Sequence, residues 1–93
     1  MTATDGIPGG DTQVLAQPDE HAHARVRQAH LVAAERHRCA AEAQNQAVRT
    51  HRAAAAAGIG DVATHRRAVR VYEAARDNHL RAAALAERMA GDP

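Results

Sequence analysis

Residues 53–61 read Ala-Ala-Ala-Ala-Ala-Gly-Ile-Gly-Asp, and this stretch divides an otherwise continuous helical sequence into two parts. Between residues 19 and 57 there is no Gly or Pro, and the abundant Ala, Arg, Glu and Gln favour a helix. Gly58 suits the left-handed position that ends a helix, with Ile59 folding back as its hydrophobic contact. Asp61 suits the N-cap of a second helix. Such a short link between two long helices predicts an antiparallel hairpin.

The same signals predict the boundaries of an all-α chain. Residues 1–17 contain Gly and Pro without any periodicity, so we expect a disordered N-terminal tail. Pro18 suits the first turn of a helix. The domain 18–93 is then a helical hairpin, with a helix at 18–57, a loop at 58–61 and a helix at 62–90. Because a helix rises 1.5 Å per residue, the first helix extends past the second by about ten residues.

The composition excludes several kinds of chemistry. Of the 93 residues 25 are Ala, all 12 basic residues are Arg, and Ser, Lys, Phe and Trp are absent. The chain therefore has no serine nucleophile, no Schiff-base or P-loop lysine, and no aromatic set on which bases could stack. Cys39 is the single cysteine, so an intrachain disulfide is impossible. Since buried Ala contributes little free energy, the composition favours self-association.

Sequence features also bear on location and partners. Residues 1–10 lack the basic and apolar regions of a signal peptide, and the longest apolar run, residues 53–57, is far too short to span a bilayer. We therefore expect a cytoplasmic protein that does not cross a membrane. The formal net charge of +1 argues against binding a polyanion through net charge alone.

Histidine recurs with a period of seven residues. Six of the seven histidines share one heptad position, which we label e, and a seven-residue step keeps side chains on one face of a helix. Gln44 and Tyr72 occupy the same position. The six histidines are His23, His30, His37, His51, His65 and His79.

With these labels, positions a and d carry mostly Ala and predict the seam between the helices. Position b is apolar as well, so positions d, a, e and b form an arc about 160° wide, more than one helix pair can bury. The remaining apolar surface predicts that two hairpins dimerise into a four-helix bundle.

Folding the hairpin about Gly58, with position a of one helix against position d of the other, predicts a row of polar pairs beside the Ala seam. The predicted pairs are His51 with His65, Gln44 with Tyr72, and His37 with His79.

This row has a structural and a functional interpretation. Buried polar side chains normally hydrogen-bond to one another and can fix the register, which requires no ligand. Imidazole is also the commonest metal ligand, so a metal, haem or small-ligand site is the alternative. The His-x-x-x-His spacing with which one helix chelates a metal is absent. Candidate ligand- or metal-binding residues are His37, His51, His65, His79, Tyr72 and Gln44.

The hairpin tip is rich in arginine. Between residues 49 and 70 five Arg are opposed by Asp61 alone, a local charge of +4 that could hold an anion or a nucleic acid. No nucleic-acid-binding motif accompanies it, which favours a solvated tip. The candidate anion-binding residues are Arg49, Arg52, Arg66, Arg67 and Arg70.

These patterns favour a small interaction or accessory protein that acts through self-association and through its helix faces. We expect a homodimer, with a protein partner as a further possibility, and no cofactor. The alternatives are a metal-, haem- or ligand-binding bundle, a small helical enzyme with His, Tyr and Arg as acid–base groups, and anion or nucleic-acid binding at the tip. The sequence favours a non-enzymatic role and identifies no substrate, catalytic residue or pathway.

Overall fold

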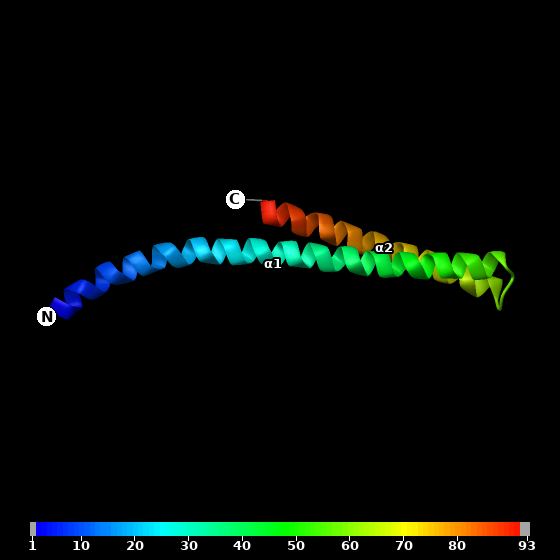
Figure 1. Ribbon diagram of the computed structural model, residues 1–93, viewed down its shortest axis with the longest axis horizontal. Helices are drawn as coiled ribbons and strands as arrows, with labels where there is room; N and C mark the ends of the chain where they lie inside the picture. Colours follow the sequence, from blue (N-terminus) through cyan, green and yellow to red (C-terminus); the bar gives the residue numbers. More distant parts are fainter. Residues whose placement is uncertain (1, 92–93) are drawn as a thin grey trace.

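Two helices form an antiparallel hairpin in the computed structural model, which describes the backbone of residues 2–91 and the side chains of residues 19–91. Helix α1 spans Thr2–Ala56 and helix α2 spans Val62–Gly91, and these described residues contain no strand. The two helices pack along the length of α2, and α1 continues beyond its end (Figure 1). The predicted all-α hairpin is confirmed. Helix α1 begins at Thr2 instead of at the predicted residue 18, and so includes residues 2–17. The side chains of these residues lie outside the described part of the chain, so the disorder predicted for 1–17 stays a prediction.

The end of α1 has the hydrogen bonds of a Schellman motif. Gly58 has a φ angle of 67°. Its N–H donates to the carbonyl oxygen of Ala55 over 3.1 Å, and the N–H of Ile59 donates to that of Ala54 over 3.0 Å. These bonds satisfy carbonyl groups that the last turn of a helix leaves free. The side chain of Ile59 is 63% exposed, so the predicted hydrophobic contact does not bury it.

Asp61 caps α2 as predicted. Its Oδ1 accepts hydrogen bonds from the backbone N–H groups of Ala63 (3.1 Å) and Thr64 (3.4 Å), and its Oδ2 accepts one from the Thr64 hydroxyl over 2.7 Å. The Thr64 hydroxyl, followed by the Thr64 backbone N–H, lowers the pKa of the Asp61 carboxyl below its ordinary value. The turn thus ends one helix and begins the next with local hydrogen bonds.

The seam between the helices lies at positions b and e and is flanked by half-buried Ala side chains at position a, such as Ala33. The prediction that position d lies in the seam is wrong. Five of the six buried apolar residues occupy position b and the sixth occupies position e, whereas Val71 and Leu85 at position d are 65% and 51% exposed. The histidines of the hairpin therefore lie in the seam instead of beside it. The buried residues are Ala34, Ala41, Val48, Ala83, Ala86 and Ala90.

The side chains at position d explain why the seam does not lie there. Arg36, Thr50 and Asn78 all occupy that position, and a seam there would remove them from water without providing partners. Position b carries Ala or Val at every helical site from residue 34 onward except Arg76. Small side chains at position b allow a close approach of the helices, and the histidines at position e hydrogen-bond to one another.

Two different faces flank the seam. Positions a and d form what we call the outer face, which carries four exposed large apolar side chains. Position f, on the other side of the seam, carries ion pairs that join the helices, Arg38 with Glu87 and Arg52 with Glu73. The four apolar side chains of the outer face are Val26, Val71, Leu85 and Met89.

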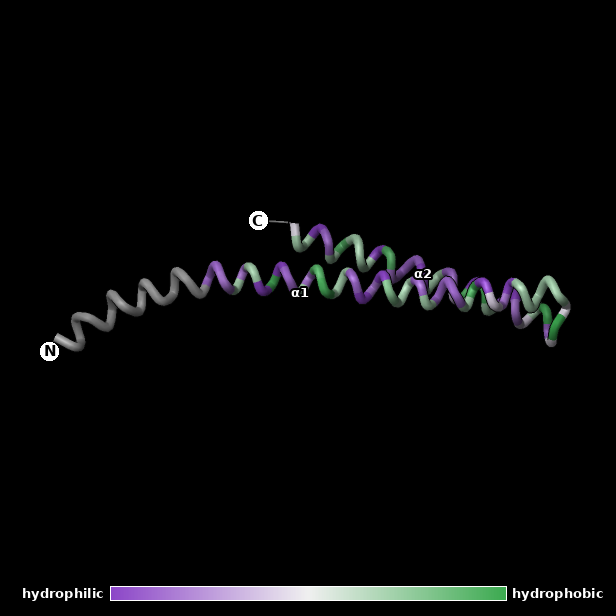
Figure 2. Tube along the Cα trace, viewed as in Figure 1, coloured by the Kyte–Doolittle hydropathy of each residue, from purple (hydrophilic) through white to green (hydrophobic). Residues whose placement is uncertain are grey.

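Hydrophilic and hydrophobic residues alternate closely along residues 19–56 of α1 and along α2 (Figure 2). Within the described part of the chain, neither helix has an apolar stretch long enough to cross a membrane.

Candidate functional site

Two pairs of histidines join α1 to α2 inside the seam. The Nδ1 atoms of His37 and His79 are 3.0 Å apart, and those of His51 and His65 are 2.8 Å apart. The ring centroids are separated by 5.3 Å in the first pair and 5.1 Å in the second, with the rings tilted by 36° and 41°. All four side chains are half-buried. The predicted pairing of these histidines is confirmed.

Each pair has the geometry of a hydrogen bond between two imidazole rings. A neutral imidazole carries a proton on one nitrogen and a lone pair on the other, so one Nδ1–H donates to the bare Nδ1 of its partner. The two rings of a pair are then different tautomers. This bond satisfies one polar atom on each ring, which removes the cost of leaving that atom unpaired in the seam.

The register that pairs 37 with 79 and 51 with 65 places Tyr72 opposite Gln44, and the Tyr72 ring makes a contact that the sequence did not predict. Its ring stacks on that of His51, with centroids 5.5 Å apart and planes inclined by 14°. Gln44 is half-buried between the two histidine pairs, and among the described side chains no hydrogen bond joins it to Tyr72. The His51 ring is thus held by two aromatic neighbours, His65 and Tyr72.

Gly60 lies beside the pair next to the turn. A Cβ atom built on Gly60 would lie 3.4 Å from Nε2 of His65, and the φ angle of Gly60 is 67°. A Cβ at this distance only touches the ring of His65, so the cost of a larger residue is mainly the strain of the left-handed backbone.

The two pairs are separate sites. His37 and His51 are 14 residues apart on α1, which corresponds to about 21 Å along the helix. Within the described residues, no three His, Cys, Asp or Glu side chains gather as a metal-binding group. Each pair therefore offers two nitrogen donors.

The histidines earlier in α1 belong to the same heptad position without forming such a pair. The register that places 37 opposite 79 places residue 30 opposite residue 86, which is Ala. His30 is half-buried, and His23 is exposed. Position e is therefore paired only where both helices supply a histidine.

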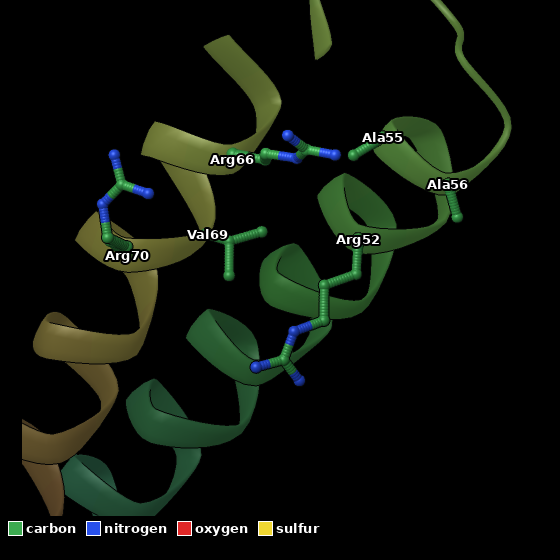
Figure 3. A pocket seen from close by; sticks show the side chains of 6 residues that line it. All are labelled: Arg52, Ala55, Ala56, Arg66, Val69 and Arg70. Carbon is green, nitrogen blue, oxygen red and sulfur yellow. The ribbon is translucent and has the colours of Figure 1, made fainter. Parts of the chain in front are cut away.

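The predicted anion-binding arginines do not converge on one point. Arg52 donates to Glu73 over 2.6 Å and Arg49 to Glu42 over 3.2 Å. Figure 3 shows a groove lined by Arg52, Ala55, Ala56, Arg66, Val69 and Arg70, in which the three guanidinium groups point in different directions. Arg67 donates to the hydroxyl of Thr64 over 3.0 Å. Anion binding at the tip stays a prediction.

Sequence reasoning missed the ionic flank at position f. Arg38 and Arg52 on α1 pair with Glu87 and Glu73 on α2. The signal was present, because position f carries Arg38 and Arg52 in the first helix and Glu73 and Glu87 in the second. Such exposed pairs are worth at most about 1 kcal/mol each, and they favour the observed register.

Compared with known proteins, the chain matches no family model, no curated protein and no solved structure.

Proposed function

We propose that this protein is a self-associating interaction protein whose outer face packs against the outer face of a second copy, forming a four-helix bundle. The observation that carries the proposal is the exposed apolar surface at positions a and d. Val71, Leu85 and Met89 follow one another along this face of α2, and each is about half exposed or more. Val26 extends the same face along α1.

The hairpin buries too little apolar surface to be strongly stable alone. Of the six buried apolar side chains among residues 19–91, only Val48 is larger than Ala. Burial contributes roughly 0.8 kcal/mol per CH₂ group, and small chains usually need an additional source of stability. A second hairpin on the outer face supplies it by burying the larger apolar side chains that the seam leaves outside.

The area of the outer face suits a dimer. The 30 residues of α2 are about 45 Å long, and two helices packed 8–10 Å apart form a face about 20 Å wide. Such a face covers about 900 Å² on each partner, close to the roughly 800 Å² of a standard stable interface. Most of its other residues are Ala, which allows the close approach of helix against helix. The polar exceptions at position d, Arg36, Thr50 and Asn78, would need hydrogen-bonding partners from the second copy.

Charge favours an antiparallel arrangement of the two hairpins. Five Arg and one Asp lie between residues 49 and 70, at the tip of the hairpin. A parallel dimer would bring two such basic tips together, whereas an antiparallel dimer separates them by the length of the hairpin. The second arrangement also places each tip near the part of the partner's α1 that extends beyond α2.

The test compares two leucines of α2 that differ mainly in the face they occupy. Leu85 lies on the outer face and is 51% exposed, and Leu80 lies on the ionic flank and is 46% exposed. We expect the wild-type chain to sediment with twice the mass of one chain. Leu85→Arg should give a monomer, because it buries an unpaired charge in the interface, while Leu80→Arg should remain a dimer.

The Leu80→Arg control distinguishes disruption of the proposed interface from a general effect of replacing an exposed leucine with arginine. A wild-type chain that sediments as a monomer at 100 µM, or a Leu80→Arg variant that dissociates as readily as Leu85→Arg, would refute the proposed interface. Circular dichroism of each variant reports whether the helices persist.

A further inference from the structure

We propose that each histidine pair binds a divalent transition-metal ion, Cu²⁺ or Ni²⁺, between its two Nδ1 atoms. The two ligands of each site belong to a single chain, so the proposal extends beyond self-association and does not depend on it. His37 with His79 forms the inner site, and His51 with His65 forms the site next to the turn.

The separation of the nitrogens indicates which metals fit. Two nitrogens bound about 2.05 Å from one ion are about 2.9 Å apart when they subtend 90°, and about 3.35 Å apart in a tetrahedron. The observed 3.0 Å and 2.8 Å are hydrogen-bond distances that lie close to the right-angle value, so an ion between the nitrogens requires rotation of the rings and little movement of the helices. Right angles belong to the tetragonal geometry of Cu²⁺ and Ni²⁺, whereas structural Zn²⁺ is tetrahedral.

Binding exchanges one hydrogen bond for two metal–nitrogen bonds. The proton on the donor Nδ1 moves through solvent to Nε2 of the same ring, so both Nδ1 atoms present lone pairs and the protein keeps its charge. The rings turn until both lone pairs point at the ion, a motion about the broad χ2 torsion of histidine. The ion loses two of its waters and keeps the others, since each site has two protein ligands.

An ion in either site links α1 to α2. The ligands are 42 residues apart in the inner site and 14 apart near the turn, so the unfolded chain does not hold them together. Metal binding therefore stabilises the hairpin. The inner site closes the longer loop and lies further from the covalent turn, so it restrains the separation of the helices more strongly.

The experiment uses the full chain without an affinity tag. A background variant carries Cys39→Ala, because an exposed thiol reacts with Cu²⁺, and His21→Gln with His23→Gln, because these exposed histidines offer a competing His-x-His group. Cu²⁺ or Ni²⁺ is added alone in a buffer that does not chelate metals. Thermal unfolding, native mass spectrometry and Cu²⁺ electron paramagnetic resonance are recorded.

We expect two ions per chain and two coupled nitrogens per Cu²⁺. With both sites at 100 times their dissociation constants, either metal should raise the unfolding midpoint by roughly 20 °C or more. His37→Gln should remove the inner ion and His65→Gln the ion near the turn. His30→Gln, a change at the same heptad position of α1, should keep both. Gln is chosen as the replacement because its side chain retains a hydrogen-bonding group. His51→Gln, which changes the ligand on α1, should remove the same ion as His65→Gln, which changes the ligand on α2.

Three outcomes would overturn the proposal. The first is an unchanged midpoint with both metals. The second is retention of both ions in the combined His37→Gln and His65→Gln variant. The third is a larger stabilisation by Zn²⁺ than by Cu²⁺ and Ni²⁺, which contradicts the right-angle geometry.

Discussion

The Nδ1 atom of His37 lies 3.0 Å from the Nδ1 atom of His79, although 42 residues separate them in the sequence. The bond occupies a position of the seam that usually carries a large apolar side chain. Because this bond forms only when His37 lies opposite His79, it favours the observed register of the two helices. Sliding one helix by a heptad would set His37 against Tyr72 and His65 against Gln44, and would leave a single histidine pair, His30 with His79, in place of two. Buried polar groups that specify register in this way are known from coiled coils.

A double-mutant cycle on the inner pair should reveal this coupling. We expect His37→Ala and His79→Ala to interact by about 1 kcal/mol in the free energy of unfolding, because either change alone leaves the other ring without its partner. Urea unfolding in the presence of a chelator measures it for the metal-free chain. His30→Ala combined with His79→Ala is the control, and an equal coupling energy there would show that the effect is not specific to the pair.

Val48→Ala should be the most costly single truncation in the seam. Val48 is fully buried, and removing its two methyl groups while keeping Cβ should cost about 1.6 kcal/mol of burial. Val32→Ala on the exposed side of α1 provides the control. Both changes replace Val with Ala and so raise helix propensity equally, but Val32→Ala does not remove buried apolar surface. Equal urea midpoints for the two variants would contradict the placement of Val48 in the core.

Gly58→Ala should destabilise the hairpin through the backbone alone. The φ angle of Gly58 is 67°, and a Cβ there meets no atom within 4 Å, so the expected cost is the roughly 1–2 kcal/mol of a left-handed conformation. Gly91→Ala, at the helical end of α2, should not destabilise the chain. Thermal unfolding measures both variants, and a neutral Gly58→Ala would argue against the Schellman turn.

The contribution of Asp61 to stability should depend on pH in a defined direction. Its pKa is lowered in the folded state by hydrogen bonds from Thr64. The folded state therefore binds this proton less readily than the unfolded state, and the stabilisation is present above the ordinary carboxyl pKa. It is lost as the pH falls through the lowered pKa.

The Asp61→Asn variant tests this dependence, because Asn accepts the same backbone hydrogen bonds without titrating. We expect wild type to be more stable than Asp61→Asn in urea at pH 7, with a difference that shrinks as the pH approaches 2. A difference that stays constant over this range would show that the charge of Asp61 plays no part in the cap.

Local signals accounted for the two helices and for the turn. Gly58 and Asp61 act through hydrogen bonds to residues within five positions of themselves, so their roles can be derived from sequence order. The histidine pairs followed from the same reasoning, because folding about a fixed turn sets 37 against 79 and 51 against 65. The stacking of Tyr72 on His51 was not predicted, because it depends on side-chain directions that sequence spacing does not specify.

The sequence by itself determined the helical hairpin, its turn and the pairing of its histidines, since these depend on interactions close in sequence and on heptad spacing. Only the tertiary structure decided which side of the wide apolar arc forms the seam. Positions d, a, e and b are all compatible with burial when each helix is considered alone. Packing decided among them, because a seam at position d would leave Arg36 and Asn78 desolvated without partners, whereas at position e His37 and His51 each find a histidine on the opposite helix.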